Sequence, residues 1–260
     1  VVTFQGQNGT LSQNLTGTGS NEAIVLSDND VTTILGEGVV TVSATQTDQA
    51  GNASSAGTLA LELDLTAPEV DSLILNASSG NYGPDSVIPV EGTLSEQAVP
   101  GQILNVILNV LDVVTPVVVP VTVGLNGTDI NGIYEVQAGH NTDDLTIDGH
   151  TNDDPSNPVT DLAGNLLLDS SSNSGSNLKT LGGGSAGTLS TGIIIDTTPP
   201  EITEWLPTAD TYIDGDDVLI QVRISEAAMP GTTISVRPNT FGALRDSIEL
   251  TLDSSDPAKT

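Results

Sequence analysis

A motif that reads as a linker occurs twice in this chain of 260 residues, and its spacing limits how the chain can fold. LELDLTAPEV occupies residues 61–70 and IIIDTTPPEI occupies residues 193–202, so the equivalent aspartates, Asp64 and Asp196, lie 132 positions apart. Each copy joins an apolar run to an Asp-x-Thr segment, a proline and a glutamate. A period of this length is that of a whole small domain, so the chain is predicted to be a tandem array.

The sequence around the motif repeats as well. NYGPDSVIPVEGTLSEQAVPG at 81–101 matches DTYIDGDDVLIQVRISEAAMPG at 210–231. TDQAGN at 47–52 matches TDLAGN at 160–165. The repetition therefore covers more than the linker and indicates equivalent domains.

These matches divide the chain into three predicted segments. Residues 65–196 form one complete β-sandwich repeat. Residues 1–64 form the C-terminal half of a preceding repeat, and residues 197–260 form the N-terminal half of a following one. The chain starts without Met and without a signal peptide, so we expect it to be a segment of something longer.

The apolar residues fall in short runs such as VVTVSAT, VIPVEGTL and VLIQVRIS, bounded by Gly, Asn, Asp and Pro. Alternation with a period of two and enrichment in β-branched residues predict an all-β sandwich, without an amphipathic helix. Polar residues and prolines interrupt the long apolar run at 103–123, which predicts two strands and a turn and not a membrane span. The Gly-, Ser- and Asn-rich tract at 168–190 predicts a long surface loop.

The order of these motifs resembles the bacterial Ig-like and cadherin-like tandem repeats of large secreted proteins and surface adhesins. The likeness lies in NASSGNYGPDSVIPVEGTLSE, AGHNTDDLTIDG, VTDLAGNLL and GIIIDTTPP, which together cover most of 65–200. The resemblance implies an all-β linear array of tandem Ig-like or cadherin-like β-sandwich domains. It also implies export by a bacterium and calcium at the interdomain junctions.

Charge limits the class of partner. The chain has 34 acidic residues against five Lys and Arg, which gives a net charge of −29. Nucleic acids and anionic membranes need a basic surface, so neither is expected as a partner. Cations are the natural counterpart, although acidity that keeps a surface hydrated in a saline habitat gives the same composition. Because Cys is absent, an exported chain of this kind needs a stabiliser other than disulfides, and calcium is the candidate.

The predicted metal site follows from the topology of such a sandwich. The incoming linker, the loop after the second strand and the turn between the last two strands meet at one end of the domain. A hard cation binds six to eight oxygen atoms, which carboxylate and amide groups supply. We therefore predict calcium ligands at this end from four residues, namely Asp64, Glu96, Asp161 and Asn165.

The two half-repeats predict head-to-tail self-association. Each half alone exposes strand edges and half a core, and such edges pair with other chains. The C-terminal half of one copy would then pair with the N-terminal half of the next, whether as separate subunits or as repeats of one long chain. The matches predict that this pairing rebuilds the metal site from Asp196, Glu226, Asp48 and Asn52.

Other interpretations of the acidic residues stay open. Asp-x-Ala-Gly-Asn is a good turn sequence without any metal, because its side chains bond their own backbone and Gly supplies a positive φ. A second acidic cluster occupies 141–155 and lacks the spacing of a helix-loop-helix calcium site. It predicts a solvated loop, with metal binding as the open alternative, and its acidic residues are Asp143, Asp144, Asp148, Asp153 and Asp154.

The sequence does not favour an enzyme. A Gly-x-Ser-x-Gly pattern surrounds Ser185, but it lies inside a Gly/Ser tract and not between a strand and a helix. His140 and His150 are predicted loop residues, and Trp205, which aligns with Leu73, is a predicted core residue. No catalytic residue is expected.

The predicted function is that of an extracellular or cell-surface structural protein, the shaft of an adhesin or the subunit of a fibre. Two alternatives stay open at this point. The first is a β-sandwich module that binds a cell-surface ligand, a glycan or a protein, through the 141–155 loop. The second is a non-catalytic appendage of a secreted hydrolase.

Overall fold

The computed structural model describes most of the chain, in two compact units, Val1–Thr197 and Thr198–Thr260. Residues 169–190 of the predicted long loop, Ser185 among them, lie outside the described residues. The described residues are 1–17, 21–111, 113–152, 154, 156–168, 191–206, 211, 220–226, 232–237, 239–240, 243–244 and 246–251.

The N-terminal part of the first unit is a four-stranded antiparallel sheet with the order β2-β1-β3-β4. Its strands are β1 (Val2–Gln5), β2 (Thr10–Gln13), β3 (Gly38–Ala44) and β4 (Gly57–Leu63). A small core lies on one face, where Phe4, Leu35 and Val40 are buried. One short helical segment, η1 (Asp30–Leu35), separates β2 from β3 and supplies Leu35 to this core.

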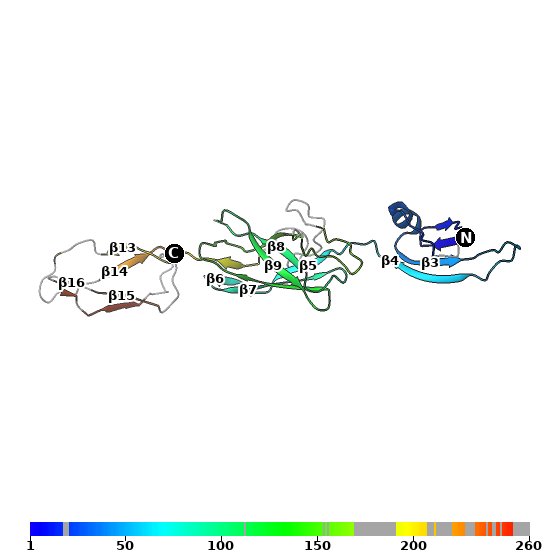
Figure 1. Ribbon diagram of the computed structural model, residues 1–260. Coiled ribbons are helices and arrows are strands. Elements are labelled where there is room, and N and C mark those ends of the chain that lie inside the picture. The colour runs from blue at the N-terminus through cyan, green and yellow to red at the C-terminus, as the bar shows by residue number, and fades with distance from the viewer. Residues whose placement is uncertain are drawn as a thin grey trace. The chain divides into compact units, whose positions relative to one another are not determined.

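The rest of the first unit is built on a six-stranded antiparallel sheet with the order β11-β8-β9-β10-β7-β5 (Figure 1). The edge strands β11 and β5 contact each other, so the sheet is nearly closed and barrel-like. The predicted pair of strands in 103–123 is confirmed, because β8 and β9 are antiparallel neighbours. The strands are β5 (Val70–Leu75), β7 (Val87–Leu94), β8 (Ile103–Leu108), β9 (Val117–Val123), β10 (Asp129–Glu135) and β11 (Ile147–Thr151).

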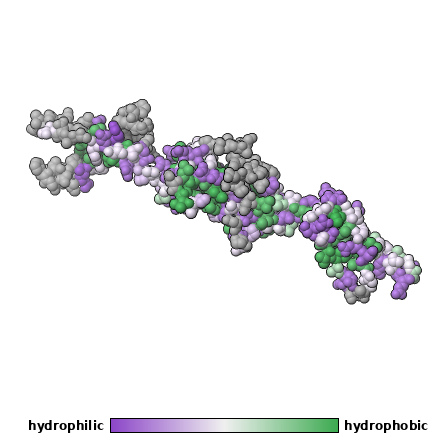
Figure 2. Space-filling view, turned by 90° about the horizontal axis from the view of Figure 1, so that it is seen from above, coloured by the Kyte–Doolittle hydropathy of each residue, from purple (hydrophilic) through white to green (hydrophobic). Residues whose placement is uncertain are grey.

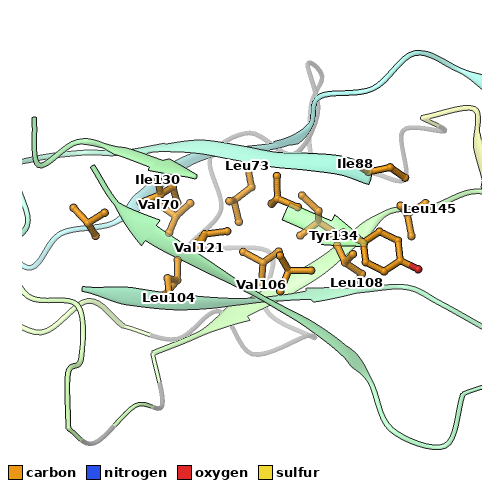
Figure 3. Close-up of a cluster of buried hydrophobic side chains, with 14 of the residues drawn as sticks. Val70, Leu73, Ile88, Leu104, Val106, Leu108, Val121, Ile130, Tyr134 and Leu145 are labelled. Atoms are coloured by element: carbon orange, nitrogen blue, oxygen red, sulfur yellow. The ribbon is translucent and has the colours of Figure 1, made fainter. Parts of the chain in front are cut away.

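Alternating side chains of these strands form the main core (Figure 3). In β8 every second residue is buried, namely Leu104, Val106 and Leu108, as expected for a strand with one face against the core. Valines of β9 pack with them from the neighbouring strand. The core is almost entirely Val, Ile and Leu, with Tyr134 as its buried aromatic residue among those described.

A separate pair of parallel strands adds to this core. β6 (Gly80–Tyr82) pairs with β12 (Ile193–Ile195), and hydrogen bonds from Gly80 N to Gly192 O and from Asp196 N to Tyr82 O extend the pairing at both ends. Ile193 and Ile195 point into the core and are buried. The last strand of the unit is therefore held by a segment that precedes it by more than one hundred residues.

The second unit begins with a strand pair that matches one in the first unit. β13 (Ile202–Leu206) pairs with β14 (Gln221–Ile224), and a bulge lies between Ile202 and Glu204. β5 and β7 pair in the same register, with their bulge between Val70 and Ser72. The other described strands of the second unit are β15 (Thr233–Val236), β16 (Asn239–Thr240), β17 (Ala243–Leu244) and β18 (Ile248–Thr251).

The same hydrogen bonds flank the two matching pairs. The amide of Ser95 donates to Glu69 O at 2.8 Å, and the Ser95 hydroxyl accepts from the Glu69 amide at 2.9 Å. Ser225 and Glu201 exchange the same two hydrogen bonds at 2.8 and 2.9 Å. Residues that the sequence alignment makes equivalent therefore have the same local geometry.

The all-β prediction is confirmed, since every described sheet except the short β6–β12 pair is antiparallel. Within the described residues no helix is both long and apolar enough to cross a membrane. The predicted boundary at 64 lies inside the first unit, and the boundary at 196 lies one residue from the division between the units. The tandem β-sandwich interpretation of 1–64, 65–196 and 197–260 stays a prediction.

The main core generates a first prediction. Leu104 is fully buried, so Leu104→Ala should lower the free energy of unfolding by about 2–5 kcal/mol, from lost burial and the cavity left behind. Urea denaturation followed by circular dichroism measures this change. The matched control is Leu125→Ala, because Leu125 is 97% exposed and its truncation should change the free energy by less than about 0.5 kcal/mol.

Candidate metal centre

Three segments far apart in the sequence bring carboxylates together in the first unit. Asp64 follows β4, Glu96 lies two residues beyond β7, and Asp161 begins the turn of a hairpin closed by the Thr160–Leu166 bridge. One oxygen from each carboxylate lies within 4.8 Å of the others. Oxygen atoms that share one calcium ion at about 2.3–2.6 Å are separated by at most about 5 Å, so this spacing fits a single cation.

The turn at Asp161 is fixed by its own side chains. One oxygen of Asp161 accepts hydrogen bonds from the amides of Gly164 at 2.6 Å and Asn165 at 2.8 Å, and the other accepts from the Asn165 side chain at 2.7 Å. Gly164 has a φ of +100°, a conformation that Gly adopts without strain. The turn thus holds the Asp161 carboxylate in place without help from any ligand.

Asn165 joins this turn to the linker. Its side-chain nitrogen donates to the Asp64 carbonyl oxygen at 3.0 Å as well as to Asp161. Gln102 supports the turn from the other side, because it accepts from the Thr160 amide at 2.8 Å and donates to the Thr160 hydroxyl at 3.2 Å. Asn165, a predicted ligand, therefore positions Asp64 and Asp161 through its amide nitrogen.

Glu96 is brought to the same place by backbone pairing. An isolated bridge pairs Ala98 with Asp161, and the Val99 amide donates to Thr160 O at 3.0 Å. One carboxylate oxygen of Glu96 is buried and has no hydrogen-bond partner among the described residues. A buried carboxylate oxygen without a donor is costly, and a cation at this point would satisfy it.

Glu37 is a fourth carboxylate at this site, and the sequence analysis did not identify it. One of its oxygens accepts hydrogen bonds from the Leu65 amide and the Thr66 hydroxyl, both at 3.0 Å. It attaches the linker to the residue before β3, and its charge reaches Glu96. No repeated motif includes Glu37, so the alignment that identified the other acids could not identify it.

The pKa values of Glu96 and Asp161 are shifted in opposite directions. Burial first, and then the charges of Asp64, Asp161 and Glu37, raise the pKa of Glu96 above its usual range. For Asp161 burial also favours the neutral form, but the hydrogen bonds donated by Asn165 and Gly164 outweigh it and lower the pKa. Asp161 is therefore held as a carboxylate, whereas Glu96 carries a charge that neither burial nor its neighbours favour.

The other four predicted ligands, Asp48, Asn52, Asp196 and Glu226, were predicted to meet only where one copy pairs with the next, and that site stays a prediction. Asp48 and Asn52 form an exposed turn with the same hydrogen bonds as Asp161 and Asn165, and the Asn52 side chain donates to Asp48 at 2.8 Å. These hydrogen bonds lower the pKa of Asp48. Asp196 follows β12, and Glu226 lies two residues beyond β14. Within the described residues, the group at Asp64 is the only one with three carboxylates at metal-binding distance.

Several residues differ from their predicted roles. Trp205, predicted as a core residue, is 49% exposed, and Asp148, predicted in a loop, is an exposed residue of β11.

Asp144 was predicted in a solvated loop, but it accepts hydrogen bonds from the amides of Thr191 and Gly192 at 2.9 and 3.1 Å and so holds the start of β12. His150 was predicted in a loop, but it lies in β11 and is fully buried. Asp153 lies outside the described residues.

Comparison with known protein families, curated proteins and solved structures found no match to this chain. What is established is a mostly-β protein with several antiparallel sheets and an acidic triad, Asp64, Glu96 and Asp161, that could hold a metal ion. The resemblance to Ig-like and cadherin-like repeats stays a prediction.

The raised pKa of Glu96 generates a prediction for the metal-free protein. A carboxyl group with a raised pKa stabilises the fold fully below its ordinary value of 4.5, and this contribution is lost as pH rises through the folded-state pKa. Glu96→Gln in chelator should therefore raise the melting temperature near pH 7, because it removes a buried and repelled charge. The gain should vanish near pH 4, where Glu96 is itself neutral.

The pH dependence of Asp161 has the opposite sign to that of Glu96. Because its pKa is lowered, its contribution to stability is present above pH 3.8 and is lost as pH falls through the folded-state pKa.

The control for Glu96→Gln is Glu135→Gln, the same chemical change at an exposed position of β10. Melting followed by circular dichroism measures both variants. A Glu96→Gln protein that melts below the parent near pH 7 in chelator would contradict the assigned electrostatics.

Proposed function

We propose that this protein is an extracellular structural repeat protein, the shaft of an adhesin or the subunit of a surface fibre, stiffened by calcium at its junctions. The observation that carries the proposal is the convergence of Asp64, Glu96 and Asp161 on the linker that leaves β4. The linker motif recurs at Asp196, so a site built on it belongs to each junction of the array.

The donor set favours calcium over softer metals. It consists of carboxylates, and the chain has no Cys. Calcium takes six to eight oxygen ligands, and carboxylates and water suit it, whereas thiolate and imidazole suit zinc and copper. Carboxylates of Asp64, Glu96 and Asp161 would supply the protein ligands, and Asn165 would hold two of them in place.

Bound calcium would join the N-terminal sheet to the sheet that follows it. Asp64 lies in the linker, Glu96 and Asp161 lie in the following sheet, and Glu37 attaches the linker to the start of β3. A divalent ion among these groups offsets their mutual repulsion, which otherwise favours separation of the segments. Such a junction transmits orientation from one domain to the next, which is the property a shaft needs.

The composition supports an extracellular location. Extracellular calcium modules bind with Kd values of about 10⁻⁴–10⁻³ M, which suits calcium concentrations outside cells. A net charge of −29 keeps a long fibre soluble and requires cations in its surroundings. The proposed partners are further copies of the array and a cell-surface ligand, and no catalytic function is proposed.

Calcium should act as a folding ligand of the first unit. Binding to the native state alone stabilises it by RT ln(1 + [L]/Kd), which is about 2.7 kcal/mol at one hundred times Kd. The melting temperature in calcium should therefore exceed that in chelator by roughly 5–10 °C. Differential scanning calorimetry in calcium and in chelator measures the shift.

Glu96→Gln should lose most of this calcium shift, because it removes the buried ligand oxygen's charge. Glu135→Gln should keep the whole shift. The order of stability should thus reverse, with the Glu96→Gln protein above the parent in chelator and below it in calcium. Equal melting of the parent in chelator and in calcium at about one hundred times the Kd of extracellular calcium modules, roughly 10–100 mM, would overturn the metal proposal.

A further inference from the structure

Strands β9 and β10 pair with each other along only part of their length. The pairing covers Val121–Val123 of β9 and Ile130–Gly132 of β10, although β9 begins at Val117 and β10 continues to Glu135. Beyond this part, β9 stays paired with β8, and β10 stays paired with β7. The two strands therefore separate while each is still held by the neighbour on its other side.

Pro120 explains where the separation begins. Backbone groups of a strand point alternately to its two neighbours. Val123 bonds towards β8, because its amide donates to Gln102 O and its carbonyl oxygen accepts from the Gly101 amide, both at 2.9 Å. Pro120 and Val118 lie an odd number of residues from Val123, so their backbone groups point towards β10. Proline has no N–H to donate, so the ladder with β10 loses its next hydrogen bond at this residue.

Backbone groups of β9 and β10 face each other across the gap. Val136, just beyond β10, bonds towards β7, because its amide donates to Ser86 O and its carbonyl oxygen accepts from the Asp85 amide, both at 2.9 Å. Glu135 precedes Val136 by one residue, so its amide points towards β9. Within the described residues, no strand pairs with Val118 or Glu135 on these facing sides. The sheet thus has two strand edges in its interior.

A cleft of about 330 Å³ opens at this gap. It is lined by Val117–Val119 of β9, by Ile133–Glu135 of β10 and by the exposed Thr115. Tyr134, which is buried, lies at its base, and the Tyr134 hydroxyl is 2.8 Å from Nδ1 of His140. The cleft therefore has two backbone edges as walls and a fixed aromatic pair beneath them.

The surroundings of the cleft are apolar and acidic. Ile133 and Val118 are 64% and 48% exposed, and Figure 2 shows hydrophobic surface on the six-stranded part of the first unit. None of the described residues that line the cleft is Lys or Arg, and burial lowers the pKa of His140, which favours its neutral form. Glu135 adds a carboxylate in a chain with a net charge of −29. The charge therefore favours a basic occupant.

The shape of the cleft favours an extended polypeptide. Two facing strand edges offer donors and acceptors to a backbone placed between them, as in the addition of a strand to a sheet edge. Each wall is about three residues long, roughly 10 Å at 3.3 Å per residue, so the segment that fits is short. The chain has only five Lys and Arg in 260 residues, so a basic segment is more readily supplied by another protein.

We propose that this cleft binds a short extended segment of a partner polypeptide that carries a basic side chain, and that the backbone of this segment pairs with Val118 and Glu135. The bound segment runs antiparallel to one of the two strands and parallel to the other, because β9 and β10 are antiparallel to each other. Its side chains then lie beside the exposed Val118 and Ile133. The site is independent of the metal centre.

The test uses the isotopically labelled full chain, nuclear magnetic resonance and the peptide acetyl-Val-Lys-Val-amide. The peptide should shift the amide resonances of Val118 and Glu135, because both amides gain a hydrogen bond. At about 90% saturation their hydrogen exchange should slow by about tenfold, since only the unbound fraction exchanges freely. The amides of Thr122 and Asn131, which lie in the paired part of the two strands, should not change.

Two matched peptides separate backbone pairing from charge attraction. The same peptide methylated at its backbone nitrogens keeps its charge but has lost its donors, so it should leave the exchange of both amides unchanged. Acetyl-Val-Glu-Val-amide keeps the backbone and reverses the charge, so it should bind roughly tenfold more weakly than the lysine peptide.

Two matched variants locate the site. Thr115→Trp fills the cleft from an exposed position and should lose binding of the lysine peptide. Thr122→Trp makes the same change at an exposed position of β9 outside the cleft, and it should bind as the parent does.

Several outcomes would overturn the inference. They are an absence of any effect of the lysine peptide on Val118 and Glu135, equal binding of the methylated peptide, and unchanged binding by Thr115→Trp. Slow exchange of both amides in the parent without peptide would also overturn it, by showing that another segment of the chain already pairs with them. None of these measurements depends on calcium, so the metal proposal stands or falls separately.

Discussion

Repulsion among carboxylates at the end of β4 is the constraint on which the arrangement of the first unit depends. Asp64, Glu96 and Asp161 are held together by backbone pairing and by the side chain of Asn165, in a chain that already has a net charge of −29. Like charges at this distance repel one another unless a proton or a cation compensates them, and this repulsion contributes to the raised pKa of Glu96. The strands therefore hold a site whose stability is set by the solution around it.

Features that depend on neighbouring residues in the sequence were predictable. The alternation of apolar residues predicted β8 and β9, because one face of each strand is buried. The turn at Asp161 was predictable because Asp, Gly and Asn bond their own backbone wherever they occur in this order, as the Asp48 turn also shows. The repeat then identified which acids are equivalent, and topology suggested that they converge.

Features that depend on tertiary packing were not predictable. Glu37 reaches the linker across 28 residues, and nothing in its local sequence indicates a role. His150 has polar neighbours in the sequence, yet β11 places it in the interior. η1 was missed because it is short, although Ser27 and Asp30 exchange hydrogen bonds at its start, in the manner of a capping box. The near-closure of the six-stranded sheet arises from the approach of β5 and β11, which no local pattern encodes.

The parallel pairing of β6 with β12 determines how the first unit responds to tension. β12 runs directly into the linker. Tension applied before β6 and after β12 therefore draws these two parallel strands in opposite directions along their length. Their hydrogen bonds are then loaded together in shear, and they must break simultaneously. An antiparallel hairpin pulled at its open end breaks one bond at a time, at lower force. Rupture under load is governed by the unfolding rate, and the β6–β12 pair would bear that load together with the β5–β7 pair, which lies nearer the N-terminal end.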